Sequence, residues 1–209
     1  AYILGFREFY GLSLKTTSAT LIPRPDTETV VEAALAKIPQ DLSFNILDLG
    51  TGTGAVALAI ASQRLQAKVT AVDASKEALE VATENSQNLN LKNVRLLQSD
   101  WFAQLKNEKF DVIVSNPPYI AEGDDHLKQG DLRFEPITAL ASGEDGLNDI
   151  RRIIQEAPNY LNPNGWLMLE HGYDQAEKVA ELLKQHVFTQ VGHASDLSGI
   201  LRVTFGTMP

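Results

Sequence analysis

The sequence predicts an α/β fold, in which a mostly parallel seven-stranded sheet carries helices on both faces and ends in an antiparallel hairpin. Two observations support this prediction. From residue 45 onward, short runs of apolar and β-branched residues alternate with segments of helical pattern, an order typical of parallel strands joined by crossover helices. The last two strand-like segments follow each other without a helix between them, so we expect them to pair as a hairpin.

Before this alternation, residues 1–23 carry aromatic and β-branched residues and are predicted to form a hairpin-like entry. Residues 26–39 predict a helix, with Asp26 as its N-cap and Pro39 as its end. Because the chain starts without a methionine and enters this segment at once, we expect it to lack an N-terminal portion. The predicted division is a connecting hairpin over residues 1–22 and one α/β domain over residues 23–209.

The remaining elements follow in order along the chain. Strands are predicted at residues 45–50, 68–73, 94–100, 110–115, 165–172, 186–196 and 200–206. Helices are predicted around residues 54–64, 76–90, 149–160 and 174–186. A long irregular stretch runs from Tyr119 to Asn148, and long loops in compact domains tend to be functional.

Composition and charge exclude several classes of protein. Apolar residues make up 44% and charged residues 22% of the chain, as in globular proteins with a core, and no apolar run approaches the roughly 18 to 20 residues of a membrane helix. The absence of cysteine excludes disulfides and thiol catalysis and agrees with a reducing cytoplasm. The formal net charge is -9 without a dense run of Lys and Arg, whereas duplex-binding proteins usually carry a basic face. We therefore predict a cytoplasmic monomer that contacts neither membrane nor nucleic acid directly.

The first predicted strand ends in a glycine-rich turn, DLGTGTGAVALAIA. Glycines let a backbone turn tightly and approach a ligand, and the N–H groups of a helix starting near Gly54 would point at that ligand. Asp73 ends the next strand, where a carboxylate can accept from both hydroxyls of a ribose. These features predict a nucleotide-like cofactor rather than a bare tight turn.

Two cofactor classes fit this pattern. Gly50, Gly52 and Ala55 satisfy the relaxed dinucleotide fingerprint. Asp48 favours S-adenosylmethionine, because a carboxylate two residues before the first glycine would attract a cationic sulfonium and repel a pyrophosphate.

A second motif, NPPY, follows the predicted strand 110–115. If the sheet is wound outward from residues 45–50 and then returns, these two strands are neighbours, and ligands bind where the winding reverses. The motif is therefore predicted to face the reactive end of the cofactor. Two plainer interpretations exist: consecutive prolines can simply end a strand, and Asn-Pro-x-Tyr is an adaptor-recognition pattern in exposed segments. The predicted buried strand before the motif disfavours the adaptor.

The NPPY motif suits methyl transfer to a nitrogen whose lone pair is delocalised, as in an amide or an aromatic amine. The Asn116 side-chain oxygen and the Pro117 carbonyl could accept both N–H bonds and orient the lone pair, because proline fixes φ and has no N–H. Tyr119 could stack on the planar group. Catalysis would then rest on positioning and electrostatics, without a strong base.

Seven segments occur together and in this order: TLIPRPDTE, DLGTGTG, AVD, SDWF, SNPPYI, RFEPITAL and LEHG. Through them nearly the whole chain resembles the HemK/PrmC family, the release factor glutamine N5-methyltransferases. NPPY alone is shared with amino-group DNA methyltransferases, whereas LIPRPDTE is much more specific. A sister family that methylates a ribosomal-protein glutamine has a different pattern after its Pro-Arg and ranks second.

The resemblance implies a Rossmann-like class I methyltransferase fold, with S-adenosylmethionine as cofactor and S-adenosylhomocysteine as product. It implies that the substrate is the glutamine in the Gly-Gly-Gln tip of peptide chain release factors. It also implies a small helical N-terminal domain that helps to bind the release factor, which we expect this chain to lack. Methylation of adenine or cytosine and non-catalytic cofactor binding are the alternatives; the acidic charge and the lack of a target-recognition domain stand against the first, and the intact NPPY against the second.

The resemblance also implies site residues. Asp73 is expected to bind the ribose and Trp101 to lie beside the adenine. The full predicted cofactor set is Gly50, Thr51, Gly52, Thr53, Gly54, Asp73, Trp101 and Asn116. The glutamine side chain is expected to contact Asn116, Pro117, Pro118 and Tyr119, of which Asn116, Pro117 and Tyr119 are the predicted catalytic residues.

Other polar and aromatic residues carry less weight. Glu170 and His171 are expected to make structural hydrogen bonds rather than to act in catalysis, and Trp166 to pack in the core. For Glu135 a role in shaping the substrate loop, and for Arg24 a substrate contact, stand beside a purely structural role. No metal site is predicted, because metal-ligand spacing is not found for His126, His186 and His193.

Overall fold

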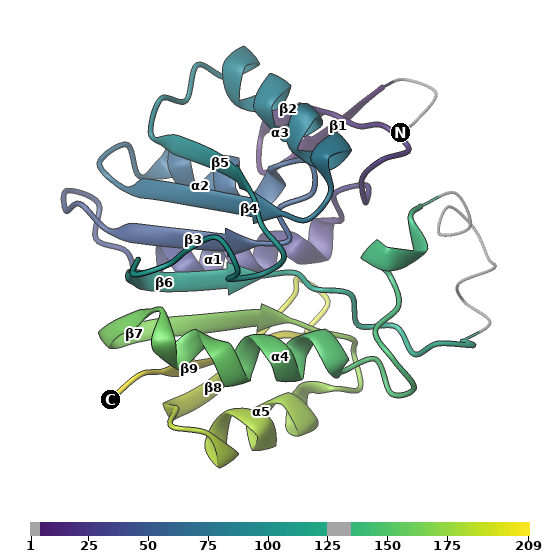
Figure 1. Cartoon of the computed structure of the whole chain (residues 1–209), viewed down its shortest axis with the longest axis vertical. Coiled ribbons are helices and arrows are strands. Elements are labelled where there is room, and N and C mark those ends of the chain that lie inside the picture. Colours follow the sequence, from purple (N-terminus) through teal and green to yellow (C-terminus); the bar gives the residue numbers. More distant parts are fainter. Residues whose placement is uncertain (1–4, 125–134) are drawn as a thin grey trace.

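The computed structural model describes residues 5–124 and 135–209 and confirms the predicted α/β fold (Figure 1). Seven strands form one sheet in the order β5-β4-β3-β6-β7-β9-β8. The neighbours from β5 to β7 are parallel, and β9 pairs antiparallel with both β7 and β8. The strands of this sheet are β3 (Asn45–Leu49), β4 (Lys68–Asp73), β5 (Val94–Gln98), β6 (Phe110–Ser115), β7 (Leu161–Glu170), β8 (Thr189–Ser195) and β9 (Leu201–Thr207).

Helices cover both faces of this sheet, as Figure 1 shows. One face packs against α1 and α2 around buried Ile46, Val112 and Met168, and the other packs against α4 and α5 around Leu47 and Ile113. The helices are α1 (Glu28–Leu35), α2 (Ala55–Gln63), α3 (Lys76–Asn88), α4 (Asn148–Glu156) and α5 (Ala176–Gln185), with the 3-10 turns η1 (Pro25–Thr27), η4 (Ile137–Ala139) and η5 (Ala157–Asn159).

The strand register brings the glycine turn and the NPPY segment to the same end of the sheet, where the parallel strands finish. Leu49 of β3 lies opposite Val72 of β4 and Ser115 of β6. The three strands therefore end level with one another, and the winding of the sheet reverses between β3 and β6. Ligands bind at this point in open α/β sheets.

A separate hairpin, β1 (Phe6–Phe9) with β2 (Leu12–Lys15), precedes the sheet. It is fastened by Asn85 of α3, whose Oδ1 accepts from Lys15 N at 2.7 Å and whose Nδ2 donates to Lys15 O at 3.1 Å. Asn85 Nδ2 also donates to the carbonyl of Thr53 at 2.9 Å. One buried side chain thus joins the hairpin, α3 and the glycine turn.

The predicted N-cap is wrong. Asp26 lies inside η1, α1 begins only at Glu28, and neither element has a side-chain cap. The Asp26 carboxylate is instead 3.0 Å from Arg202 Nη2 of β9, so a partner from the far end of the chain takes the oxygen that a cap would use.

Other boundaries also differ from the predictions: α1 already ends at Leu35, β5 ends at Gln98, and β8 begins only at Thr189. β7 begins at Leu161 and not at residue 165, because an irregularity in the pairing with β6 carries the strand through Pro163. α4 ends at Glu156, and the chain continues through Pro158 as η5; proline lacks the N–H that an α-helix requires.

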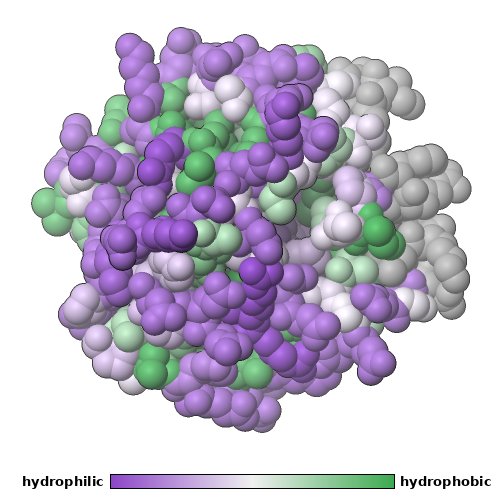
Figure 2. Space-filling model, viewed as in Figure 1, coloured by the Kyte–Doolittle hydropathy of each residue, from purple (hydrophilic) through white to green (hydrophobic). Residues whose placement is uncertain are grey.

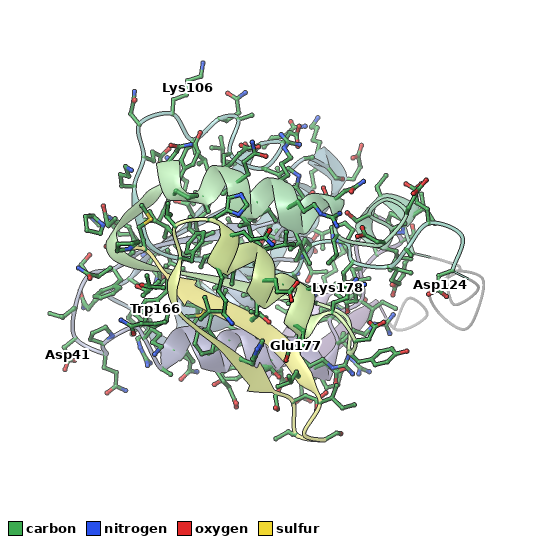
Figure 3. All side chains as sticks on the ribbon, turned by 90° about the horizontal axis from the view of Figure 1, so that it is seen from below. Asp41, Lys106, Asp124, Trp166, Glu177 and Lys178 are labelled. Atoms are coloured by element: carbon green, nitrogen blue, oxygen red, sulfur yellow. The ribbon has the colours of Figure 1, made fainter. Side chains whose placement is uncertain are left out.

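The surface in the same view is mostly hydrophilic with small, separate hydrophobic groups (Figure 2). One of these lies over η4, where Ile137 is 58% exposed. Trp166 lies on the other side of the molecule from Asp124 (Figure 3) and packs edge-on against Phe205 with ring centroids 5.8 Å apart, which confirms its predicted packing role. Within residues 5–124 and 135–209, every helix is too short or too polar to cross a membrane.

Candidate active site

A cavity of about 540 Å³ lies at the edge where β3, β4 and β6 end, within the roughly 300 to 1,000 Å³ of small-molecule sites. Segments far apart in the sequence line it, including η1, the glycine turn, the residues after β5, the NPPY segment and η4. The predicted site residues that line it are Gly50, Thr51, Gly52, Thr53, Asp73, Trp101, Asn116 and Pro118. Among the described residues, the predicted members that do not line it are Gly54, Pro117 and Tyr119.

The glycine turn combines an open position with a packed one. Gly52 has a φ of +55°, and a Cβ added there would meet no atom within 4 Å, so its backbone is accessible from the cavity. Gly54 has a φ of +85°, and an added Cβ would lie 3.0 Å from Leu58 and 3.3 Å from Ala82. Gly54 therefore lets α2 start close to α3, and its place is beneath the turn.

Asp48 supports the turn from inside. Its Oδ2 accepts from Thr51 Oγ1 at 2.6 Å and from Ala57 N at 3.2 Å. Burial raises the pKa of Asp48 to about 7, and these hydrogen bonds oppose that rise. Asp48 also lines the cavity, so one side chain both holds the glycine turn and faces the space beside it.

The Asp73 carboxylate lies at the wall of the cavity and is tied to the backbone on both sides. Oδ2 accepts from Gly52 N at 2.9 Å and Oδ1 from Ser75 N at 2.9 Å. Burial raises the pKa of Asp73, while these backbone hydrogen bonds lower it. A carboxylate has about four acceptor positions, so this side chain can still accept from a ligand.

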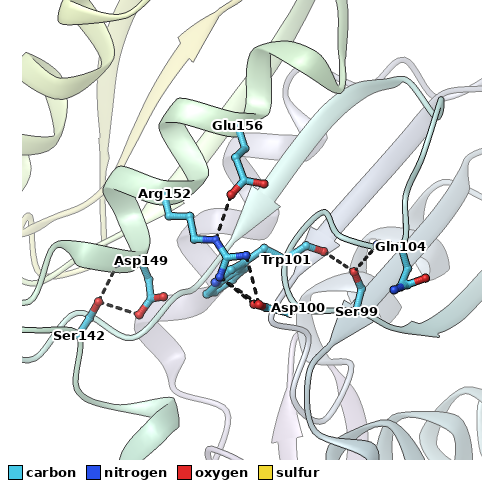
Figure 4. Close-up of polar contacts among 8 residues, drawn as sticks. All are labelled: Ser99, Asp100, Trp101, Gln104, Ser142, Asp149, Arg152 and Glu156. Carbon is cyan, nitrogen blue, oxygen red and sulfur yellow. Dashed lines mark hydrogen bonds and ion pairs between the residues drawn. The ribbon is translucent and has the colours of Figure 1, made fainter.

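A network of polar contacts holds the segment after β5 (Figure 4). Trp101 adopts a φ of +47°, and Ser99 Oγ donates to the Trp101 carbonyl at 2.7 Å. Arg152 of α4 donates to the neighbouring Asp100 at 2.9 Å. The Trp101 ring lies so close to Gly50 that a Cβ there would be 3.4 Å from it, and the indole forms one side of the cavity.

The NPPY segment is anchored at both ends. Ser115, just before it, donates through Oγ to the Leu49 carbonyl at 2.8 Å. At the other end, the Tyr119 hydroxyl donates to Glu170 Oε1 at 3.3 Å, and Gln175 Nε2 donates to the Tyr119 carbonyl at 2.9 Å. Between these anchors, Asn116 Nδ2 donates to Thr27 Oγ1 at 3.2 Å.

Glu170 is the last residue of β7 and His171 follows it, and both side chains are buried. Glu170 is 2% exposed, and burial raises its pKa to about 7. His171 is fully buried, with Nε2 at 2.8 Å from Thr204 Oγ1 and Nδ1 at 2.9 Å from the Gly172 carbonyl. Burial lowers the pKa of His171, and its two partners give it the structural role that was predicted.

An ion pair closes one side of the cavity. Arg24 Nη2 lies 2.8 Å from Glu135 Oε1, and the same oxygen accepts from Ile22 N at 3.4 Å. Arg24 and Pro136, the residue after Glu135, both line the cavity. The pair thus joins the segment before α1 to the segment that leads into η4. His126 lies outside the described residues.

Thr27 is one of several cavity residues that the sequence predictions did not single out. It is 4% exposed, lines the cavity and touches Asn116. Thr27 lies in the segment LIPRPDTE, but its contact with Asn116 spans 89 residues of sequence. No local sequence pattern could have predicted that contact.

Known proteins are similar to this chain in sequence and in overall fold. A sequence profile described as "Methyltransferase domain" matches residues 41–202. A release factor glutamine methyltransferase of Salmonella typhimurium is 50% identical over 206 residues, which cover 99% of this chain and 74% of that protein. The enzyme of the same name from Pseudomonas aeruginosa is 52% identical, with the same coverage.

This chain belongs to the release factor glutamine methyltransferase family. A solved structure in the family, the release factor-specific protein-(glutamine-N5) methyltransferase of Alicyclobacillus acidocaldarius, is 30% identical, with a TM-score of 0.54 over 90% of this chain and 94% of that one. The predicted resemblance and the class I methyltransferase fold are confirmed. Membership in the release factor glutamine methyltransferase family also sets aside the dinucleotide, the DNA and the ribosomal-protein alternatives.

Proposed function

We propose that this chain transfers the methyl group of S-adenosylmethionine to N5 of the glutamine in the Gly-Gly-Gln tip of peptide chain release factors. One observation carries this proposal: a single cavity is lined both by the glycine turn with Asp73 and by Asn116 of the NPPY segment. Family membership supports the cofactor and the substrate. Because release factors act in translation, the proposed place of action is the cytoplasm, and the proposed enzyme is a monomer.

The residues around the cavity fit this cofactor. The Gly52 backbone faces open space, Asp73 keeps acceptor positions for hydroxyls, and the Trp101 indole offers a flat face. The proposed contacts are therefore the glycine turn with the methionine part, Asp73 with the ribose and Trp101 with the adenine. When bound, S-adenosylmethionine supplies a methyl group on a sulfonium that a nitrogen lone pair can displace.

The proposed role of the NPPY segment is to orient the glutamine amide. Asn116 Oδ1 and the Pro117 carbonyl would accept the two N–H bonds, which turns the nitrogen lone pair toward the methyl group. As the nitrogen–carbon bond forms and the carbon–sulfur bond breaks, the nitrogen becomes acidic and loses one proton. Catalysis of this kind depends on positioning and on fixed dipoles.

Tyr119 has a different proposed role from that of a base. Burial and the neighbouring Glu170 raise the pKa of its phenol, so the hydroxyl stays protonated at neutral pH. Its hydrogen bond to Glu170 fixes the end of the NPPY segment. Pro118, which lines the cavity, and the Tyr119 ring are the proposed apolar contacts of the glutamine side chain.

Transfer of a labelled methyl group to a panel of substrates tests this function. The panel contains an intact release factor, the same protein with its Gly-Gly-Gln glutamine replaced by alanine, a ribosomal protein and DNA. Label is expected only in the intact release factor. An equal rate on the ribosomal protein or on DNA would contradict the proposed substrate.

A further inference from the structure

The β1–β2 hairpin forms a two-stranded sheet of its own beside α3 (Figure 1). A hairpin of two strands is at best marginally stable by itself in water. Phe9 and Leu14 are 1% and 0% exposed and pack in one core with residues of α1 and α2. The Lys15 ammonium pairs with Glu84 of α3 at 2.6 Å. The hairpin is therefore held in place by side-chain contacts with the helices.

Asn85 of α3 adds three hydrogen bonds to this attachment. Its Oδ1 accepts from Lys15 N at 2.7 Å, and its Nδ2 donates to the carbonyls of Lys15 at 3.1 Å and of Thr53 at 2.9 Å. Because a backbone N–H can only donate and a carbonyl can only accept, these partners fix which atom of the amide faces each of them. Asn85 is 1% exposed, so water cannot readily replace any of the three bonds.

The Thr53 carbonyl takes its hydrogen bond from outside its own helix. The usual helical donor to it would be Ala57 N, four residues further along, but Ala57 N donates to Asp48 Oδ2 at 3.2 Å. Thr53 is 2% exposed and lines the cavity, and a buried carbonyl without a donor is unfavourable. The bond from Asn85 therefore fixes the peptide between Thr53 and Gly54, the last one before α2.

The chain itself also leads from the hairpin to the cavity. β2 ends at Lys15, and Ala19, Thr20 and Leu21 line the cavity a few residues later. Displacement of the hairpin would therefore disturb the cavity at two places, the glycine turn and the segment that follows β2.

We propose that Asn85 is a positioning residue for S-adenosylmethionine, which couples docking of the β1–β2 hairpin to the shape of the glycine turn. Asn85 lies outside the lining of the cavity and acts through the Thr53 carbonyl. This inference rests on the proposed function, because the cofactor is the one proposed there. Such coupling is reciprocal: the factor by which a docked hairpin lowers the dissociation constant of the cofactor equals the factor by which bound cofactor favours the docked hairpin.

The reciprocal effect can be measured in the wild-type protein with S-adenosylhomocysteine as the probe. Hydrogen exchange at the Lys15 amide, which is bonded to Asn85 Oδ1, reports local opening of the hairpin. Saturating S-adenosylhomocysteine is expected to slow this exchange about fivefold or more relative to its effect on the Asn164 amide. The Asn164 amide donates to the Met208 carbonyl at 3.0 Å, near the start of β7 and far from the cavity. An equal effect on both amides would contradict the coupling.

Asn85→Asp tests the residue itself. It keeps the size and the acceptor for Lys15 N but removes both N–H donors. By calorimetry, the dissociation constant of S-adenosylhomocysteine is expected to rise about 5- to 50-fold, because the free turn then spends less time in the shape that binds. The protection of the Lys15 amide by S-adenosylhomocysteine should fall below about twofold.

Asn93→Asp is the matched control. Asn93 Nδ2 also donates to buried backbone, namely to three carbonyls in the last turn of α2 and just beyond it, each at 3.2 Å. It precedes β5, at the end of the sheet where the parallel strands begin. The dissociation constant of S-adenosylhomocysteine is expected to change less than about twofold in this variant, since its amide has no bond to the glycine turn.

Three outcomes would overturn the coupling: an unchanged dissociation constant in Asn85→Asp, an equal rise in Asn93→Asp, or a wild-type Lys15 amide that S-adenosylhomocysteine does not protect. The last measurement needs no variant, so it decides the matter even if Asn85→Asp does not fold. A wild-type protein that shows the protection but does not methylate the release factor would overturn the proposed function and not the coupling. A protein that methylates the release factor without this protection would do the reverse.

Discussion

The backbone N–H of Gly52 donates to Asp73 Oδ2 across 2.9 Å, so the carboxylate proposed to bind the ribose also holds the glycine turn. Preorganisation of the turn and recognition of the cofactor therefore depend on one side chain. A substitution that removes both side-chain oxygens, such as Asp73→Ala, therefore affects the turn and the cofactor contact together.

Asp73→Ala is expected to raise the dissociation constant of S-adenosylmethionine about 10- to 100-fold, because hydrogen bonds to a charged group contribute about 1.5 to 3 kcal/mol. Asp73→Asn keeps one acceptor for the turn and is expected to fall between wild type and alanine. Isothermal calorimetry measures both. An unchanged affinity in Asp73→Ala, in a protein that is still folded by circular dichroism, would refute the assignment.

Asn116→Ala is expected to reduce the single-turnover rate by a factor on the order of 100 to 1,000, the usual loss for one preorganised polar contact, with the cofactor affinity largely kept. Asn116→Asp retains an oxygen of the same shape and is expected to keep partial activity, so the order is wild type, Asp, Ala. Rapid-quench transfer of labelled methyl gives these rates. A near-normal rate in the alanine variant would contradict the proposed role of Asn116 and would leave the NPPY segment only the role of ending a strand.

The raised pKa of Glu170 predicts that the stability of the protein depends on pH. Because burial raises its pKa from an ordinary value near 4.5 to about 7, the folded state binds more protons than the unfolded state between these two values. The free energy of unfolding should therefore fall as the pH rises from about 5 to 7, by on the order of 3 kcal/mol for such a shift. Asp48, whose pKa is also raised to about 7, adds a contribution of the same sign.

Urea unfolding at several pH values between 5 and 8 checks this expectation. Glu170→Gln should flatten the wild-type dependence and should be less destabilising, or more stabilising, at pH 8 than at pH 5. If the variant and the wild type change in parallel over this range, the titration belongs to other groups.

The exposed side chain of Ile137 predicts a contact between η4 and the release factor. It is 58% exposed in η4, while its neighbours Pro136 and Thr138 line the cavity, so a protein that inserts a glutamine there would cover it. Ile137→Ser is expected to raise the KM for the release factor about fivefold or more, in keeping with loss of an apolar interface residue, and to leave cofactor affinity unchanged. Leu65→Ser is the control: Leu65 is 70% exposed and precedes β4, at the opposite edge of the sheet. Equal effects of the two substitutions would argue against a contact at η4.

Local patterns predicted much of this molecule. The strands β3, β4 and β6, the glycine turn and Asp73 are contiguous signals, and the sheet order follows from the winding rule once they are known. Interactions between distant segments could not be predicted in this way. Asp26 satisfies the local rule for an N-cap, but Arg202 takes its carboxylate.

The same limit applies to the site. Asn116 is conspicuous because it follows a buried strand and precedes two prolines. Thr27, which accepts a hydrogen bond from the Asn116 amide, is an ordinary threonine in the sequence and comes next to Asn116 only when η1 is folded against the end of β6. Glu170 was predicted to be structural, and its buried hydrogen bond to Tyr119 agrees with that prediction.

The position of β9 between β7 and β8 has a consequence for the order of events during synthesis. β7 leaves the ribosome before β8 and β9, so for that interval its outer edge is unpaired, and such edges are prone to pair with other chains. Over the same interval, Glu170 is present at the end of β7 but Arg202, which β9 carries and which favours the charged carboxylate, is not. The ion pair of Arg202 with Asp26 and the effect of Arg202 on Glu170 are therefore established only when the β8–β9 hairpin docks on β7.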